Sequence, residues 1–305
     1  MFDRRQLVAG LAGLPLLPAA ASAQGAWQTR FPELVFAVIP AENASGTVER
    51  YTPFTEYLTR ELGTKVTLRV ANDYAAVIEG QRAGNIHFAF YGPSSYVRAH
   101  TVTNGGVVPF VVEVLQDGSV GYYSVLYVRA NNPATRIEDL RGKNLCLVDP
   151  NSTSGNNVPR FAMSKLGINT PDQFFSRVVY AGSHENAVTA VMQGTCDAAF
   201  NWWNSETDSN LSRMVAKGMV KAEDFKMIFK SDLIAGSPVA YLTSLPEEAK
   251  AALTKAFVEA PVKAKAAFDR WSDGKNQGFR PTTHADYQSI VDLQRFVDQM
   301  RRNRS

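Results

Sequence analysis

The sequence predicts an α/β protein of two lobes with a ligand cleft between them. Two stretches of the chain alternate short apolar, strand-like runs with helical patterns, and β-rich segments without helices connect the two stretches. The chain has 305 residues, 45% hydrophobic and 20% charged, which is enough to bury a large core and to form two domains. Because more than one extended segment connects the units, we expect a hinge of two extended strands.

The first 23 residues predict an export signal. "MFDRRQLVAGLAGLPLLPAAASAQ" carries charged residues, then an apolar run, then Ala21-Ser22-Ala23, which has the form of a signal-peptidase site. The apolar run contains Pro15 and Pro18 and is shorter than the roughly 20 residues that span a bilayer. We expect residues 1–23 to be a signal peptide. The pair Arg4-Arg5 fits a twin-arginine signal as well as an ordinary one, so the export route stays open.

The first unit begins at Leu34. "LVFAVIP" is typical of a buried strand, "RYTPFTEYLTREL" of an amphipathic helix and "KVTLRVA" of a second strand. A helix over residues 74–83, the strand "IHFAFYGP" and a helix from Ser94 follow. This β-α-β-α-β-α order predicts a mostly parallel sheet with helices on both faces.

The second unit follows two β-rich runs, Val107 to Glu113 and Gly121 to Ala130, which a turn at "QDGS" separates. After a short helix at "IEDLRGK", the strands "NLCLVDP", "FFSRVVYAG" and "CDAAFNWW" are each followed by helical sequence. Residues 226–242 are again β-rich and return to the first unit, and the chain from Pro246 onward is helical. We therefore expect lobe 1 to comprise residues 24–125 and 235–305, with the C-terminal helices, and lobe 2 residues 126–234.

Composition argues against several functions. A net charge of +3 with scattered basic residues is not the footprint of a nucleic-acid-binding protein. No G-x-S-x-G, H-E-x-x-H or phosphate-binding loop with its lysine occurs, so we expect no enzyme, although His184 beside a serine could imitate a catalytic pair. No close pair of metal ligands occurs either, and we expect neither a metal nor a cofactor.

The two cysteines leave an alternative open. Cys146 and Cys196 lie near the starts of two strand-like runs, and an exported protein matures in an oxidising compartment. If the two strands are neighbours, the sulfurs can form a disulfide. Otherwise the cysteines are buried and free on opposite faces of the sheet.

The stretch "DPNSTSGNNVPRF" follows the strand "LCLVD" and precedes a helix expected from about Asn157. A helix N-terminus exposes unpaired N–H groups and attracts anions. Ser152, Thr153 and Ser154 add hydroxyl donors, and Gly155 lets the backbone approach a ligand closely. The alternative is that these residues only cap the helix and form its turn.

Two further strand ends strengthen the prediction of an anion site. In "YAGSHENAV", Ser183 is an expected N-cap and His184 the first helical residue, where an imidazole can donate to an oxyanion and a bound dianion would raise its pKa. By itself such a histidine is more often an exposed turn residue. Tyr91 ends the strand "IHFAFYGP" of the other unit, before Ser94 and Ser95. Since open α/β sheets bind ligands at the carboxyl ends of their strands, we expect the three ends to meet at the cleft.

The motifs "DPNSTSG", "GSHENAV", "FYGPSSY", "RYTPF" and "GYYSVLYV" together resemble those of the periplasmic phosphonate- and phosphite-binding components of ABC importers, the PhnD-like proteins. The resemblance covers roughly residues 34–246. It implies a type II periplasmic-binding fold, a periplasmic location, and a monomer that delivers a small phosphorus oxyanion to a membrane permease and its ATPase. The implied ligand-binding residues are Ser152, Thr153, Ser154, His184, Tyr91, Tyr51 and Asn204.

Departures from the family narrow the expected ligand. Members that bind aminoethylphosphonate hold its ammonium with carboxylates, and the matching positions here are Asn204 and Ser237. Because a buried ammonium without a partner is costly, we expect a compact ligand such as phosphite, methylphosphonate or phosphate, with Trp202 and Trp203 filling the remaining space. A sensor that presents its ligand to a receptor kinase is the alternative. Cysteine-dependent arsenite binding is disfavoured because both cysteines lie at strand starts, away from the cleft.

Overall fold

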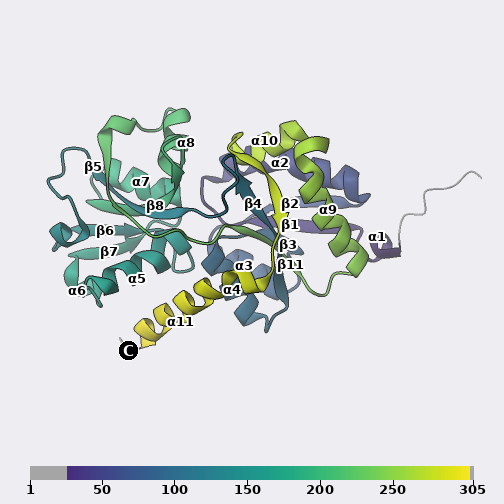
Figure 1. Ribbon diagram of the computed structural model, residues 1–305, viewed down its shortest axis with the longest axis horizontal. Helices are drawn as coiled ribbons and strands as arrows, with labels where there is room; N and C mark the ends of the chain where they lie inside the picture. Colours follow the sequence, from purple (N-terminus) through teal and green to yellow (C-terminus); the bar gives the residue numbers. More distant parts are fainter. Residues whose placement is uncertain (1–25, 303–305) are drawn as a thin grey trace, which may run out of the picture.

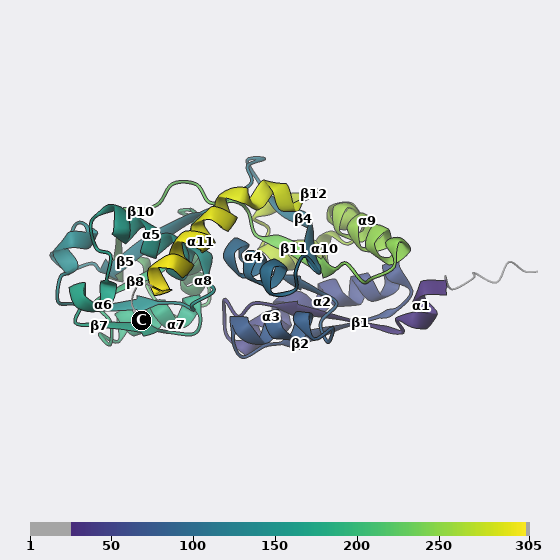
Figure 2. The same ribbon diagram turned by 90° about the horizontal axis from the view of Figure 1, so that it is seen from below.

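The computed structural model describes residues 26–302 and consists of two lobes, each built on a six-stranded sheet (Figure 1). The strand order is β12-β4-β11-β3-β1-β2 in lobe 1 and β10-β5-β8-β6-β7 in lobe 2, where β9 pairs with β8. Helices pack on the faces of both sheets, and the lobes lie end to end in an elongated molecule (Figure 2). The predicted two-lobed α/β fold is confirmed.

Lobe 1 combines parallel and antiparallel strands. β1 pairs in parallel with β2 and β3, whereas β11 and β12 run antiparallel to β4. Its strands are β1 (Glu33–Val38), β2 (Lys65–Val70), β3 (Phe88–Phe90), β4 (Val107–Leu115), β11 (Pro238–Leu242) and β12 (Asn276–Pro281). Its helices are α1 (Ala26–Arg30), α2 (Ala44–Leu62), α3 (Tyr74–Arg82), α4 (Pro93–Val102), α9 (Glu247–Lys263) and α10 (Lys265–Ser272). The expectation of a wholly helical C-terminal part is wrong, because β12 adds an edge strand beside β4.

Lobe 2 carries the predicted second alternation. Its strands are β5 (Tyr123–Arg129), β6 (Asn144–Leu147), β7 (Arg177–Tyr180), β8 (Ala198–Ser205), β9 (Asp208–Ser209) and β10 (Phe225–Lys230). Its helices are α5 (Val158–Lys165), α6 (Pro171–Phe174), α7 (His184–Met192) and α8 (Asn210–Ala216), with short turns η1 (Ile137–Leu140), η2 (Thr153–Asn157) and η3 (Ala222–Asp224). A disulfide joins Cys146 in β6 to Cys196 just before β8, strands that are paired in parallel. The open alternative of two free cysteines is thereby excluded, and thiol-based arsenite binding has no free thiol to use.

The chain crosses between the lobes at residues 116–122 and again at residues 231–237, close to the expected boundaries at 125 and 235. The two crossings lie side by side, since Tyr122 and Ile234 exchange backbone hydrogen bonds of 3.1 and 2.8 Å. Gly121, with a φ of 137°, occupies a region that favours glycine, and a Cβ there would lie 2.6 Å from the Ile234 carbonyl oxygen. These segments form the predicted hinge.

A third connection runs outside the hinge. After η4 (His284–Tyr287), α11 (Gln288–Arg302) leaves lobe 1 beside α4 and ends against α5 of lobe 2 (Figures 1 and 2). Arg98 on α4 forms an ion pair of 2.6 Å with Asp298, and Phe161 on α5 packs edge-on against Phe296. The final helix therefore holds both lobes.

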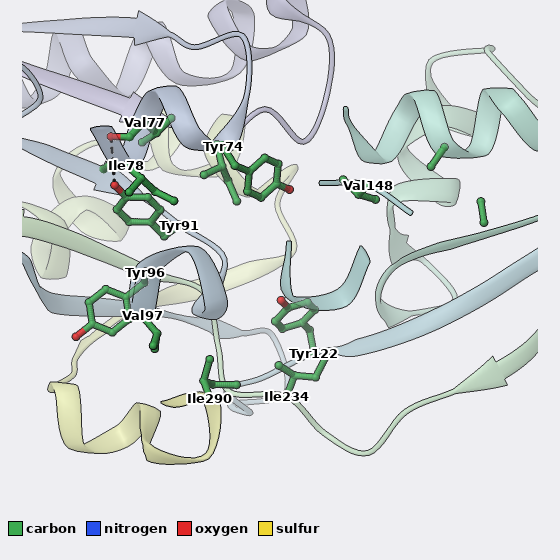
Figure 3. Packing of buried hydrophobic residues seen from close by; sticks show 14 of the residues in the cluster. Tyr74, Val77, Ile78, Tyr91, Tyr96, Val97, Tyr122, Val148, Ile234 and Ile290 are labelled. Atoms are coloured by element: carbon green, nitrogen blue, oxygen red, sulfur yellow. Dashed lines mark hydrogen bonds between the residues drawn. The ribbon is translucent and has the colours of Figure 1, made fainter. Parts of the chain in front are cut away.

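A cluster of buried apolar residues also spans the lobes (Figure 3). It includes Tyr74 and Tyr91 of lobe 1, Tyr122 of the hinge and Val148 of lobe 2.

No helix within residues 26–302 is long and apolar enough to cross a membrane. The predicted signal peptide, residues 1–23, lies outside the described residues.

Candidate functional site

A cavity of about 130 Å³ lies between the two lobes, at the carboxyl ends of β1, β3, β6, β7 and β8. The strand-end argument therefore located the cleft. The cavity brings together the seven ligand-binding residues that the family resemblance implies, and Ser237 with them. They are Tyr51, Tyr91, Ser152, Thr153, Ser154, His184 and Asn204. Their contact with a ligand stays a prediction.

The hydroxyl-rich segment after β6 forms one turn of π-helix, η2, which is called a π-turn below. It directly precedes α5, which begins at Val158. Its conformation is fixed within lobe 2: the Ser152 hydroxyl accepts from the Gly155 N–H at 3.1 Å, and the Ser124 hydroxyl donates to the Ser154 carbonyl at 2.6 Å. A Cβ on Gly155 would lie 2.4 Å from the Val148 side chain, so only glycine fits there. Such π-turns often occur at functional sites.

Thr153 connects this turn with lobe 1. Its hydroxyl oxygen accepts from the Ser94 N–H, at the N-terminus of α4, at 2.8 Å. The Ser94 hydroxyl itself is buried and has no partner. Because a helix N-terminus offers N–H groups and partial positive charge, an oxyanion at Thr153 would be close to donors from both lobes.

His184 is the first residue of α7 and is 4% exposed. Its Nδ1 lies 2.9 Å from Oδ1 of Asn201 on β8. Burial lowers the pKa of His184 to about 4, and the hydrogen bond with Asn201 opposes that shift. The sequence analysis expected a bound dianion to raise this pKa, but in the ligand-free protein the ring is neutral near pH 7.

The hydroxyl of Tyr91 already has a partner within lobe 1. It donates to Gln81 Oε1 at 2.8 Å and is directed toward Val77 of α3 (Figure 3). Tyr91 also lines the cavity, and its contact with a ligand stays a prediction.

Two tyrosines that the sequence analysis did not name, Tyr74 and Tyr122, also line the cavity. Burial raises the pKa of Tyr74, while hydrogen bonding with Ser152 acts in the opposite direction. Burial also raises the pKa of Tyr122 to about 12, against hydrogen bonds with Thr153 and Ser154. Both phenols are therefore protonated at neutral pH and lie beside the turn.

Glu113 is the third lining residue that sequence reasoning missed. Its Oε1 accepts from Trp271 Nε1 at 2.7 Å and from Asn276 Nδ2 at 2.8 Å, and burial raises its pKa to about 7. Glu113 is the acidic residue of the otherwise apolar strand "VVPFVVEVL", which was the available signal. The sequence analysis left the cavity without a carboxylate, and Glu113 corrects that.

Aromatic rings form the rest of the lobe 1 wall. The Tyr51 ring meets Trp271 edge-on with 4.8 Å between centroids, and burial raises the pKa of its phenol. Trp271 also packs tilted against Phe54 and Phe90. This wall is built mainly from packed rings, with the hydrogen bond from Trp271 to Glu113 among them.

On the lobe 2 side, Asn204 donates its amide to Asp208 at 2.6 Å. The Arg213 guanidinium lies 4.8 Å above the Trp202 ring, and both residues line the cavity. Trp203, in contrast, packs against Tyr123 outside the cavity lining. The expectation that Trp203 fills the ligand space is wrong, because successive residues of β8 point to opposite faces.

Charged side chains also join the lobes. Lys217, directly after α8, bridges Glu42 of lobe 1 at 2.6 Å and Glu185 of lobe 2 at 2.7 Å. Glu185 in turn accepts from the Asn43 N–H at 2.9 Å. Arg213 pairs with Asp208 of its own lobe and, across the cleft, with Asp273, each at 3.2 Å.

Within residues 26–302, no group of three or more His, Cys, Asp or Glu side chains could hold a metal ion.

The comparisons with known proteins agree with this geometry. Residues 36–287 match the family described as "ABC transporter, phosphonate, periplasmic substrate-binding protein". The chain is 34% identical over 290 residues to the phosphate-import protein PhnD of Mycolicibacterium smegmatis, covering 90% of this chain and 87% of that one. It is 37% identical over 222 residues to the phosphonates-binding periplasmic protein of Escherichia coli, covering 71% of this chain and 63% of that one.

Among solved structures, the binding-protein component of an ABC phosphonate transporter from Pseudomonas aeruginosa superposes with a TM-score of 0.79. The two chains are 27% identical, and the match covers 88% of this chain and 87% of that chain.

Proposed function

The chain belongs to the phosphonate family of periplasmic substrate-binding proteins of ABC transporters, and from this premise we propose that it binds a small phosphorus oxyanion between its lobes and delivers it to an importer. One observation carries the proposal: the hydroxyl of Thr153 and the N-terminus of α4 meet across the cavity. Oxyanions bind at such clusters of hydroxyl and N–H donors. The partners are the membrane permease and the ATPase of the importer, and the protein acts as a monomer.

The oxyanion site comprises Ser152, Thr153, Ser154 and His184 of lobe 2. Tyr74 and the N-terminus of α4 face it from lobe 1, and Tyr122 from the hinge. Tyr51 and Asn204 border the space that the fourth substituent on phosphorus would occupy. Ligand contacts from both lobes favour the closed state over the open one, and the permease then recognises the closed state.

A compact ligand fits this cavity best. A space of about 130 Å³ suits an oxyanion with a hydrogen, methyl or hydroxyl substituent. Glu113 could pair with an ammonium, but its Oε1 already accepts two hydrogen bonds, and the charge of Arg213 lowers its pKa from the same cavity. An ammonium would have to compete with that arginine, so phosphite, methylphosphonate and phosphate remain the preferred candidates.

Isothermal titration of residues 24–305 tests the proposal, with phosphite, methylphosphonate, phosphate, aminoethylphosphonate and arsenite in one buffer. We expect tight binding of at least one compact phosphorus oxyanion and weak binding of aminoethylphosphonate. If aminoethylphosphonate binds most tightly, Glu113→Gln should abolish that preference, while Gln at the exposed Glu56 should leave it intact. No heat with any of the five would contradict the proposed function.

Delivery to an importer and presentation to a receptor kinase differ in what recognises the closed state. Uptake of the preferred ligand by vesicles that contain the permease and ATPase should require this protein. If the protein binds its ligand tightly but supports no uptake, the result would favour presentation to a receptor kinase over delivery to an importer.

A further inference from the structure

The hydrogen bonds around His184 determine which of its ring nitrogens carries a proton. Asn201 is fully buried and uses each end of its amide for a backbone group. Its Oδ1 accepts from the Trp202 N–H at 2.9 Å, and its Nδ2 donates to the His184 carbonyl oxygen at 3.0 Å. A backbone N–H can only donate and a carbonyl oxygen can only accept, so the amide cannot be flipped.

The tautomer of His184 follows from this arrangement. Oδ1 of Asn201 is an acceptor, and it lies 2.9 Å from Nδ1 of His184, so Nδ1 must be the donor. In a neutral imidazole the other nitrogen then carries a lone pair. Since Nδ1 is engaged in lobe 2, the ring edge with Nε2 is the one left for the cavity that His184 lines.

We propose that Nε2 of His184 accepts a hydrogen bond from a P–OH group, so that the protein binds the singly protonated form of its oxyanion and Asn201 acts as the positioning residue. This inference rests on the proposed function. The remaining oxygens of the ligand would face the hydroxyls of η2 and the N–H groups of α4, which are donors. The site therefore combines donors for bare oxygens with one acceptor for the protonated oxygen.

The charged groups near His184 are committed elsewhere. On α7, the carboxylate of Glu185 binds Lys217, directly after α8, and the Asn43 N–H of the loop before α2. Across the cavity, Glu113 of β4 binds Trp271 and Asn276. The pKa of His184 responds only to burial and to Asn201, and burial lowers it to about 4.

The remaining ionisable groups of the cavity do not reverse the lowering of the His184 pKa. Arg213 of α8 pairs with Asp208 and Asp273. Burial raises the pKa of Tyr51, Tyr74, Tyr91 and Tyr122, which are therefore neutral donors or packed rings. With a second pKa of about 6 for phosphate-type groups, the shared proton stays on the ligand rather than on the imidazole. A helix N-terminus also lowers the pKa of a histidine and keeps it neutral in other proteins.

The first test is nuclear magnetic resonance of the protein labelled with ¹⁵N-histidine, free and saturated with phosphite. We expect His184 to show one protonated and one bare nitrogen in both states. Two protonated nitrogens in the complex would overturn the inference while leaving phosphite binding, and thus the proposed function, intact.

Affinity supplies an independent readout. The dissociation constant of phosphite should rise tenfold per pH unit above the second pKa of phosphite, because only the protonated form binds. Sulfate, which has no proton at neutral pH, and the methyl monoester of methylphosphonate, which has one charge and no P–OH, should not compete. Competition by sulfate, or an affinity independent of pH, would contradict the inference. Silence of every phosphorus oxyanion at every pH would instead overturn the proposed function itself.

Asn201→Asp tests the positioning role. A carboxylate beside Nδ1 stabilises the imidazolium, so the nitrogen signals should become alike and the fall in phosphite affinity should begin at a higher pH. A merely structural role for Asn201 predicts weaker binding with the pH profile of the parent protein. The measurements on the unaltered chain decide the question even if this variant fails to fold.

Discussion

The two walls of the cavity are built on different principles. On lobe 2, the η2 turn and His184 are held by hydrogen bonds within their own lobe, such as Ser124 to Ser154 and Asn201 to His184. On lobe 1, Tyr51 and Trp271 are held mainly by packing against other aromatic rings, to which Trp271 adds one hydrogen bond to Glu113. The lobe 2 wall is therefore prepared for a ligand before the lobes meet, whereas the lobe 1 wall provides shape and excludes water.

This contrast suggests an order of events in which the oxyanion first engages lobe 2 and lobe 1 then closes over it. Changes to the turn should reduce affinity in every state, whereas changes to lobe 1 should alter selectivity, stability or the rate of release. The following variants test that division, from the largest expected effect to the smallest.

Gly155→Val should abolish detectable ligand binding. A Cβ at this position would lie 2.4 Å from the Val148 side chain, so the π-turn must rearrange. Titration measures the loss, and circular dichroism reports whether lobe 2 remains folded. Gly278→Ala is the matched control, since its Cβ would meet only Pro261 at 3.7 Å. Retained affinity in Gly155→Val would show that the turn does not hold the ligand.

Thr153→Ala should weaken binding by roughly 1.5 to 3 kcal/mol, which corresponds to about 10- to 150-fold, because a donor to a charged group is lost. The same variant removes the hydroxyl that joins the turn to the Ser94 N–H. Thr153→Ser keeps the hydroxyl and should retain most of the affinity. Equal affinities for the two variants would exclude Thr153 from the oxyanion site.

Glu113→Gln should raise the free energy of unfolding relative to the parent protein, and the increase should be larger at pH 8 than at pH 5. The folded-state pKa is raised to about 7 from 4.5, so the carboxyl contributes stability that is fully present below pH 4.5 and is lost as the pH rises through 7. The glutamine removes a loss on the order of 2 kcal/mol and can keep the hydrogen bonds to Trp271 and Asn276.

Urea unfolding of Glu113→Gln and the parent at both pH values measures this change. The exposed Glu56→Gln serves as control. A stability difference that is the same at pH 5 and pH 8 would argue against a raised pKa. Affinity for a compact oxyanion should change little, in contrast with the turn variants.

Lys217→Met should have the smallest effect. The lysine bridges Glu42 and Glu185 across the cleft, and its side chain is 31% exposed. Its loss should reduce the free energy of lobe closure by about 0.5 to 1 kcal/mol, which corresponds to a roughly two- to fivefold loss of affinity. High salt should shrink the difference. Lys263→Met, whose partners Glu61 and Glu259 lie within lobe 1, should leave affinity unchanged. An equal loss in both variants would point to a general charge effect.

The same contrast explains what the sequence could predict. The η2 turn, where we propose that the oxyanion binds, is a local motif, because Ser152 to Gly155 are consecutive and follow a recognisable buried strand. Glu113 and Trp271 meet across 158 positions of the chain, so no local pattern announces their contact. The direction of the Tyr91 hydroxyl depends on Gln81 of a neighbouring helix. β12 was missed since "NQGFRP" combines glycine, proline and polar residues, which are rare inside strands.

The path of α11 has a consequence for the mechanics of the molecule. Two adjacent crossing segments by themselves permit both bending and twisting of one lobe against the other. α11 adds a line of attachment away from that axis, and it reaches the binding turn itself through the 3.0 Å hydrogen bond from Asn157 to Gln294. Because three segments connect the lobes, twisting of one lobe against the other is resisted. Bending at the hinge is then the motion that costs the least free energy. Opening should therefore follow a single path along which α11 slides on α5.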